Sequence, residues 1–302
     1  MDATCYESEV RYPTDVKLLW ESVEWCYSRM GQMCRLLEVP LLRTKYLKWS
    51  RRYVSYSKMR KKPAKKTRTL TRSSLLLLKK LCDFLKPHQV LLPAKDLDAF
   101  KTILKVHSQQ YALFHKGIKP SNRIVSLNKP YLRPIVRGKE IKAVEFGAKV
   151  NKIQIDGISF IEHISFNAFN EGIRFTNSVH KAQSLTHTKV RVAGADAIYA
   201  TNKNRNFATS QKIKTDFKPK GPKPKDHKQQ QQLRSLITKE RASSMEGSFG
   251  KDKEHYHLRK IKAKTAATEI LWIFFGIHTG NAVEIGRRMA AAEKHRIRSQ
   301  AA

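Results

Sequence analysis

The sequence predicts an α/β chain in which a long, basic helical block interrupts a mixed sheet. Two observations carry this prediction. Apolar residues recur at helical spacing through the region from about 16 to 117, and after about 144 the period changes to the short runs of strands. The order of elements is an extended start, a helical block, a hairpin, a helix, two strands and further helices. A chain of 302 residues can hold one large domain or two ordinary ones.

Local residues predict where the helices of the helical block begin and end. Thr14 is typical of a helix N-cap, and Asp15 lies at the positive end of the helix dipole. The first amphipathic helix is stopped by Pro40, an apolar helix is ended by Pro87, and a third helix is closed by Gly117. The region from about 16 to 117 is therefore expected to be mainly helical.

The strands follow, with one clear turn. Asp156-Gly157 is a tight hairpin turn between the apolar runs 144–155 and 158–166. A short helix is expected over 178–185, a buried strand over 189–194 with Asp196 at its carboxyl end, and a further strand over 212–217. The segment 218–232, rich in Lys, Pro and Gln, is expected to be a mobile basic connection, and the rest is expected to be mostly helical.

The charge balance points to a polyanionic partner. Lys and Arg number 60 against 25 Asp and Glu, a net charge of +35, and 40% hydrophobic residues are enough for a core. Nucleic acid is the first candidate and an anionic membrane surface is the second. The apolar run 270–277 is far shorter than the roughly 20 residues that span a bilayer. The start lacks the regions of a signal peptide, and the four cysteines lack metal-site spacing. A cytosolic, soluble protein is expected.

The span 39–82 contains no acid and fifteen Lys or Arg. Tyr46, Trp49, Tyr53 and Tyr56 are interleaved with these cations. Cations that neutralise phosphates and aromatic rings that stack on unpaired bases are typical of a nucleic-acid groove. The alternative is a solvated basic helix whose aromatic residues face the core. Under the first interpretation the candidate DNA-binding residues are Arg51, Arg52, Lys61 and Lys62.

Three acids fall at positions that suit one fold. The order of elements is that of a ribonuclease H-like mixed sheet with a mainly helical basic insertion after the first strand. Asp2 lies on the first strand of such a sheet, Asp196 follows the fourth, and Glu246 lies on the late helix. Phosphodiester cleavage and joining uses two divalent ions about 3.5–4 Å apart, and carboxylates suit Mg²⁺ or Mn²⁺. Three acids at these positions would suit that chemistry.

Five stretches together resemble the DDE transposases of bacterial insertion sequences, in the subgroup with a glutamate, six residues and a lysine. They are Asp2-Ala-Thr4 with Arg11-Tyr-Pro-Thr-Asp15, Arg133-Pro-Ile-Val-Arg-Gly-Lys139, Phe146-Gly-Ala-Lys149, Ala195-Asp-Ala-Ile-Tyr-Ala-Thr201 with Asn204-Arg205, and Met245-Glu-Gly-Ser-Phe-Gly-Lys-Asp-Lys253.

The resemblance implies Mg²⁺-dependent cleavage at transposon ends and transfer of the freed 3′-hydroxyl to target DNA. It also implies that Asp2, Asp196 and Glu246 are the catalytic residues and metal ligands, with Asp2 and Asp196 holding the ions and Glu246 completing the site. It implies that Lys253 contacts the DNA end, and it makes Arg137, Lys149 and Arg205 further candidate DNA contacts. The implied partners are transposon-end and target DNA, with a homodimer in the DNA complex and no membrane, in the bacterial cytosol and on the nucleoid. The subgroup often carries an Arg four positions before the glutamate. Here that position is Ala242, and Arg241 precedes it.

The predicted domains are a discontinuous catalytic domain over 1–15 and 140–285, a basic helical insertion over 16–125, and a basic tail over 286–302. Because only Met1 precedes Asp2, the resemblance implies an N-terminally truncated transposase that binds DNA and cleaves it weakly or not at all. The alternative function is a non-catalytic basic protein that binds DNA or RNA. That alternative explains the charge equally well, but not an acid that ends a buried strand.

Overall fold

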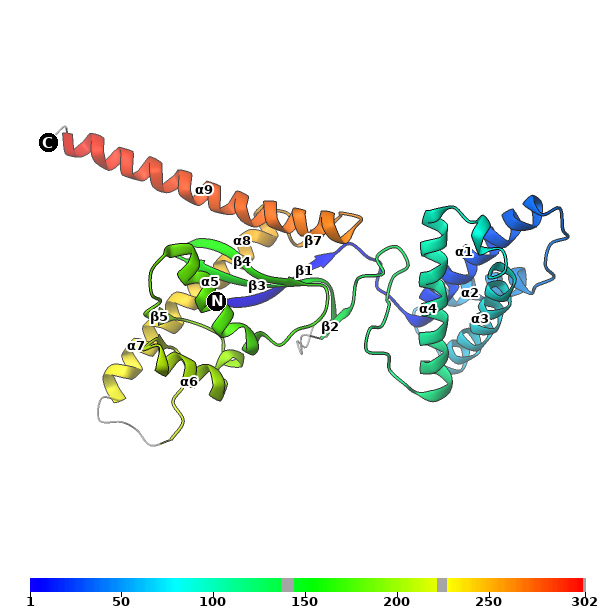
Figure 1. Cartoon of the computed structure of the whole chain (residues 1–302), viewed down its shortest axis with the longest axis horizontal. Helices are drawn as coiled ribbons and strands as arrows, with labels where there is room; N and C mark the ends of the chain where they lie inside the picture. Colours follow the sequence, from blue (N-terminus) through cyan, green and yellow to red (C-terminus); the bar gives the residue numbers. More distant parts are fainter. Residues whose placement is uncertain (137–143, 222–226, 301–302) are drawn as a thin grey trace. The chain divides into compact units, whose positions relative to one another are not determined.

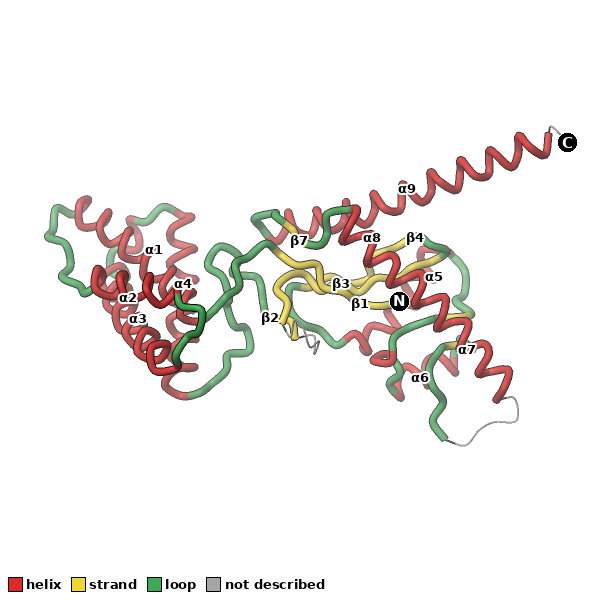
Figure 2. The backbone as a smooth tube through the Cα atoms, turned by 180° about the vertical axis from the view of Figure 1, so that it is seen from behind, coloured by secondary structure: helices red, strands yellow, loops and turns green. Residues whose placement is uncertain are grey.

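The computed structural model describes residues 1–136, 144–221 and 227–300. The chain divides into two compact units, one over Val10–Arg133 and the other over Met1–Glu9 together with Pro134–Ala302. The first is referred to below as the helical unit and the second as the α/β unit. Figures 1 and 2 show a group of packed helices in the helical unit, and a twisted sheet with helices around it in the α/β unit.

The helical unit is built from four long helices whose ends follow local chemistry. They are α1 (Asp15–Leu36), α2 (Tyr46–Lys58), α3 (Ala64–Leu85) and α4 (Ala94–Lys116). The Thr14 hydroxyl accepts a hydrogen bond from the Lys17 amide at 3.3 Å, as the N-cap prediction requires. Helix α4 ends at Gly117, whose φ of 67° permits the left-handed turn that closes it. These two predicted boundaries are confirmed.

The core of the helical unit lies between α1 and α3. Its fully buried side chains include Leu19, Trp20 and Met30 on α1, and Leu78 and Leu81 on α3. The apolar faces that the helical periodicity predicts are thus packed on one another, which stabilises helices that would be marginal alone.

The α/β unit is organised around strand β1 (Asp2–Ser8). It pairs antiparallel with β3 (Val144–Ile155), and its last residues pair parallel with β7 (Lys260–Ile261). On its other edge β3 pairs with β4 (Ile158–Ser165), and its first residues pair with β2 (Pro134–Val136). The sheet is therefore mixed, in an α/β unit that also carries many helices.

The predicted hairpin is confirmed at the residue level. Asp156 and Gly157 connect β3 to β4 with φ values of 47° and 74°. A two-residue turn with both φ values positive matches the right-handed twist of the flanking strands, and Asp-Gly is a preferred pair for it.

The two strands predicted over 189–194 and 212–217 are much shorter in the structure, where they form a small second sheet. Strand β5 contains only Val192–Ala193, and it pairs parallel with β6 (Lys214–Thr215). The prediction of a buried strand over 189–194 is wrong, because Lys189 and Arg191 are exposed and Val192 is 51% exposed. Ala193 is buried in the core of Phe175, Val179 and Tyr199, and the partly buried Val190 packs against the same core.

Alternation along β1 assigns different partners to its two faces. Its even-numbered residues face the C-terminal helices α8 (Gly247–His255) and α9 (Ala266–Gln300): Thr4 contacts Lys253, Tyr6 contacts Asp252, and Ser8 contacts Glu269. The opposite face of the sheet carries Asn151, which lies opposite Ala3 in register. Asn151 hydrogen-bonds Ser178 of α5 (Phe175–Thr186) at 3.0 Å. Helices therefore cover both faces.

Two basic segments are more ordered than the composition predicts. Helix α7 (His227–Arg241) includes the glutamine run 229–232, which was expected to be part of a mobile connection. Glutamine is a good helix former, so a glutamine run without Gly or Pro can be helical. Helix α9 likewise continues to Gln300 and includes most of the predicted tail. Residues 222–226 lie outside the described residues.

The most deeply buried ion pair in the α/β unit joins β3 to α8. The Lys152 ammonium lies 2.5 Å from Asp252, and the two side chains are 0% and 6% exposed. The Tyr6 hydroxyl donates to the same carboxylate oxygen at 2.5 Å.

Replacing Lys152 by Met should destabilise the α/β unit by about 3–5 kcal/mol, because Asp252 would be left as an uncompensated buried charge. The double replacement Lys152→Met with Asp252→Leu removes both charges and should recover much of this loss. Hydrogen exchange of the β1 amides in urea measures both. The exposed pair of Arg259 with Glu254 is a matched control, and Arg259→Ala should leave exchange unchanged. Exchange that is equally unaffected by Lys152→Met would contradict the prediction.

Candidate functional site

Asp2 stands at the start of β1, close to the second, smaller sheet. Its Oδ1 accepts a hydrogen bond from the Ala3 amide at 2.7 Å, and its side chain is 18% exposed. The preceding Met1 amino group donates to the Gly194 carbonyl at 2.7 Å, across 193 positions of sequence. The contact brings the start of β1 to the end of β5.

Asp196 lies just beyond that end. It is exposed, and its Oδ1 accepts from the Ala197 amide at 2.7 Å, which caps the short 3₁₀ helix Ala197–Tyr199. The Asp216 carboxylate holds the same turn by accepting from the Ala195 amide at 3.0 Å. Asp196 is therefore carried by a turn with fixed backbone hydrogen bonds, which is a suitable mount for a metal ligand.

A π-helical turn, Ala242–Glu246, joins α7 to α8 and ends at Glu246. A π turn contains one residue more than an α turn, and such turns are frequent at functional sites. Arg241, which precedes Glu246 by five residues, thereby comes into the place that an arginine four residues before the glutamate would take in a regular α-helix. The shift of the arginine by one residue, from position 242 to Arg241, is thus matched by the extra residue of the π turn.

Arg241, the last residue of α7, lies close to two carboxylates. Its guanidinium lies 3.7 Å from the Asp2 carboxylate and 3.5 Å from the Asp216 carboxylate. Its Nε is buried, and it has no hydrogen-bond partner among the described residues. Glu246 itself is exposed, and its convergence with Asp2 and Asp196 stays a prediction. Lys253 donates to the Thr4 hydroxyl at 3.2 Å, so it lies over the face of β1 that carries Asp2.

The electrostatics of Asp2 mark a cluster of like charges. Burial raises the pKa of Asp2, and the carboxylates of Asp196 and Glu171 raise it further, against the opposing effects of the Ala3 amide and Arg241. Burial, together with Glu171, Asp2 and Asp196 among the surrounding carboxylates, also raises the pKa of the Tyr199 hydroxyl. Tyr199 is buried and donates to Asn151 at 2.5 Å. Carboxylates from three separate segments therefore act on one another here.

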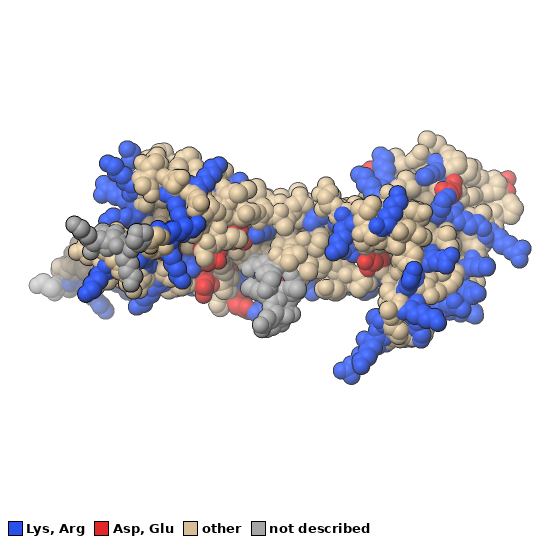
Figure 3. Space-filling model, turned by 90° about the horizontal axis from the view of Figure 1, so that it is seen from below, with Lys and Arg blue, Asp and Glu red and all other residues tan. Residues whose placement is uncertain are grey.

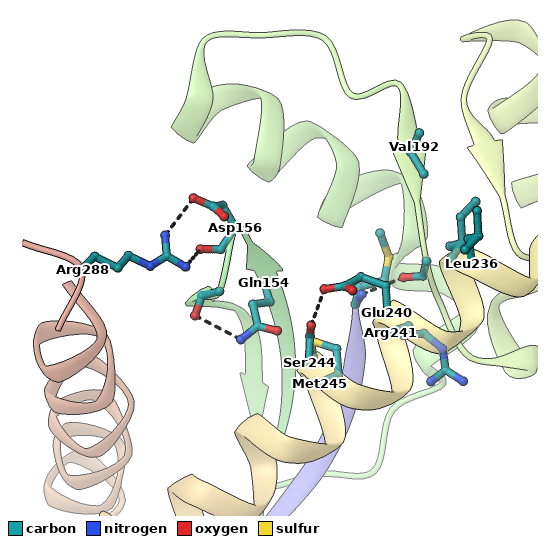
Figure 4. Close-up of a pocket in the computed structure, with 13 residues that line it drawn as sticks. Gln154, Asp156, Val192, Leu236, Glu240, Arg241, Ser244, Met245 and Arg288 are labelled. Carbon is teal, nitrogen blue, oxygen red and sulfur yellow. Dashed lines mark hydrogen bonds and ion pairs between the residues drawn. The ribbon is translucent and has the colours of Figure 1, made fainter. Parts of the chain in front are cut away.

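A cavity of about 580 Å³ lies beside Arg241. Figure 4 shows Arg241, Glu240 and Leu236 on α7, with Gln154 and Asp156 from the β3–β4 hairpin and Arg288 from α9. Glu240 accepts from the Ser244 hydroxyl at 2.7 Å, and Arg288 donates to the Asp156 carboxylate at 2.8 Å. A side chain at Gly194 would come within 3.1 Å of Ile237, so this glycine allows α7 to approach the end of β5.

Comparison with known families now adds to this geometry. Residues 193–276 match the family model described as Transposase DDE domain. The match supports a transposase DDE domain over this stretch. The matched stretch begins at β5 and contains Asp196, Glu246 and Lys253, while Asp2 lies outside it. No curated protein and no solved structure matches the chain.

A transposase DDE domain implies an enzyme of the nuclease and transposase kind that acts on DNA in transposition and recombination. Proteins with such domains generally use divalent metal ions. Over the described parts of the chain, no group of three or more His, Cys, Asp or Glu side chains could hold a metal ion. No helix in these parts is long and apolar enough to cross a membrane.

The candidate DNA-binding residues differ in what surrounds them. Arg51, Arg52, Lys61 and Lys62 are exposed on or after α2 in the helical unit. Lys149 is buried, and its ammonium lies 2.7 Å from Glu171, so its charge is already paired within the α/β unit. Arg205 is half-buried and donates to the Ala200 carbonyl at 3.1 Å. Arg137 lies outside the described residues.

Sequence reasoning missed Glu171 and Asp216. Glu171 begins a short 3₁₀ helix, Glu171–Arg174, and forms an ion pair with Lys149. Its carboxylate contributes to the raised pKa of Asp2. Asp216 directly follows β6 and holds the turn that carries Asp196. The sequence predicts a strand over 212–217 with Asp216 inside it, and only the observed end of β6 at Thr215 places Asp216 after the strand. Nothing in the sequence singles out Glu171.

The raised pKa of Asp2 should respond to each neighbouring charge with a defined sign. Glu171→Gln should lower it, since a like charge is removed, and Arg241→Gln should raise it further. The folded state holds the Asp2 proton to higher pH than the unfolded state, so the contribution of Asp2 to stability is lost as pH rises through this pKa. Carboxyl ¹³C NMR measures the titration. An Asp2 pKa that is equal in both variants would rule out the described cluster.

Proposed function

We propose that this chain is the catalytic part of a DDE transposase, which cleaves transposon ends and joins them to target DNA with Mg²⁺ or Mn²⁺. The observation that supports this most is the hydrogen bond from the Met1 amino group to the Gly194 carbonyl, which joins the segment of Asp2 to that of Asp196. The Asp196 carboxylate also contributes to the raised pKa of Asp2. Asp196 and Glu246 lie within the family match, whereas Asp2 lies outside it.

The strand arrangement supports a ribonuclease H-like sheet as part of this proposal. Three antiparallel strands run in the order β4-β3-β1, and the parallel pair β5-β6 follows. The Met1–Gly194 hydrogen bond joins the start of β1 to the end of β5. In this interpretation the helical unit is an insertion between β1 and β2.

The donor chemistry fits a hard divalent cation. Asp2 and Asp196 would hold it with carboxylate oxygens, and Glu246 would complete the set from the start of α8. When bound, the ions would activate the attacking oxygen and stabilise the leaving one. Burial is the main cause of the raised pKa of Asp2, and a cation would also relieve the smaller contribution of the neighbouring carboxylates.

Two cations of the chain would hold the DNA end. Lys253 lies over the Asp2-bearing face of β1 and would bind a phosphate near the cleaved bond. Arg241 would contact a second phosphate, since its side chain lines the cavity described above and lies beside the carboxylates of Asp2 and Asp216. Both residues would position the strand, and the three acids would carry the metal chemistry.

Any nicking of supercoiled DNA by the chain in the presence of Mg²⁺ should be weak, and Asp196→Asn should lower its rate by at least about 10²-fold, because a lost metal ligand removes several kcal/mol of transition-state stabilisation. Glu246→Gln should behave similarly. Glu254→Gln is the control, since it changes an exposed acid of α8, the helix that follows Glu246. Isothermal titration with Mg²⁺ gives a second readout. Nicking and Mg²⁺ binding that survive Asp196→Asn would refute the catalytic assignment.

Phosphate contacts by the exposed cations should dominate affinity for duplex DNA. Figure 3 shows Lys and Arg spread over the visible face of both units, and the span 39–82 contains no acid to oppose them. If six to ten phosphates are contacted, affinity should fall by roughly 10³–10⁵ between 50 and 200 mM salt. Fluorescence anisotropy with a labelled duplex measures this slope. An affinity that hardly changes over this range would exclude a mainly electrostatic interface.

A further inference from the structure

A second cavity lies within the helical unit, between α2 and α3, and the catalytic proposal does not use it. Its volume is about 420 Å³, which is within the usual range for small-molecule and base-sized ligands. It is lined by Trp49, Arg52, Ser55, Tyr56, Met59, Lys65, Lys66, Thr69 and Leu70. We refer to it as the Trp49 cavity.

The four aromatic residues of α2 divide into two pairs with different environments. Tyr46 and Tyr53 stack on the core residue Trp20, with ring centroids 5.7 and 5.0 Å away, so for them the core-facing interpretation holds. Trp49 and Tyr56 line the Trp49 cavity. The members of each pair are seven residues apart, about two helical turns, so each pair forms its own stripe along the helix.

The walls of the Trp49 cavity are held in place. The Tyr56 hydroxyl is 2.8 Å from the Thr67 hydroxyl on α3, which fixes the ring between the two helices. Trp49 also packs against the helical core through part of its surface. A ring that is already fixed loses little conformational entropy when a ligand stacks on it.

Cations surround this aromatic floor. The Arg52 guanidinium lies 4.8 Å from the Trp49 ring centroid, and the Lys62 ammonium lies 4.9 Å from the Tyr56 ring centroid. Lys65 and Lys66 reach the same rim from α3 and are exposed. The ligand that suits this combination has a flat aromatic group between negative charges, which describes a nucleotide within a strand.

We propose that the Trp49 cavity holds an unpaired base of a DNA strand, stacked on Trp49, while Arg52, Lys65 and Lys66 bind the flanking phosphates. The choice of DNA rests on the proposed function. A duplex offers phosphates but no free base face, so the cavity should distinguish single-stranded from duplex DNA.

The full-length chain can be tested by fluorescence anisotropy with a labelled single strand and with the matching duplex. Trp49→Ala should weaken single-strand binding about 5- to 150-fold and leave the salt slope unchanged, since stacking on the base is lost and phosphate contacts are kept. Trp49→Phe should restore most of the affinity. Lys65→Ala with Lys66→Ala should instead lower the salt slope by about 0.7 for each charge removed.

Because Trp49 also touches the core, the wild-type chain supplies an independent test. A strand with abasic sites keeps its phosphates and lacks its bases, so it should bind more weakly than the normal strand at the same salt slope. Equal binding of the two strands would overturn the proposal. An equal loss of single-strand and duplex affinity in Trp49→Ala would also overturn it, and tighter binding of the matching RNA would overturn the assignment to DNA.

These outcomes can be separated from those of the catalytic proposal. If the Trp49 cavity does not bind a base, Asp196-dependent nicking and salt-dependent duplex binding persist. If the catalytic proposal fails, nicking is absent while the difference between normal and abasic strands can still be measured.

Discussion

The buried ammonium of Lys152 determines how α8 lies on the sheet. The residue belongs to β3 and is fully buried, and burial lowers its pKa against the opposing effect of Asp252. A buried charge is tolerated only when it is paired and hydrogen-bonded. Asp252 and Ser248 supply the two contacts at 2.5 Å, and they lie one turn apart on α8. Only one rotation of α8 satisfies both contacts, so the pair fixes which residues of the helix face the strands. Lys253 is then directed to Thr4, and Glu246, about two turns earlier, lies on nearly the same side of the helix.

Strand β1 contacts all three C-terminal helices of the α/β unit. Every second residue of the strand carries a polar side chain on the same face, and these side chains connect Asp2 to Arg241, Thr4 to Lys253, Tyr6 to Asp252 and Ser8 to Glu269. Every partner comes from the last quarter of the chain. The strand is thus the template on which α7, α8 and α9 are arranged, and it connects a residue at position 2 to side chains from the C-terminal part of the chain.

The sequence predicts features that depend on neighbouring residues and misses those that depend on distant ones. The Asp156-Gly157 turn and the Thr14 cap are local chemistry, and both were predicted correctly. The strand at 189–194 was overestimated because alternating apolar residues show amphipathicity, while burial depends on what packs over them. The aromatic residues of α2 could not be divided from the sequence, since Tyr53 and Tyr56 differ in environment only through Trp20 on one side and α3 on the other.

The charges of the chain act over different ranges, and this separates affinity from geometry. Exposed cations such as Arg51 and Lys61 act through water, where salt limits their reach to about 8 Å at physiological ionic strength. The Lys152–Asp252 pair and the Arg241 contacts are buried or nearly so, and they are screened much less. Added salt therefore weakens attraction to a polyanion long before it disturbs the positions of Asp2 and α8. A net charge of +35 can thus serve a DNA partner without the site depending on that charge for its shape.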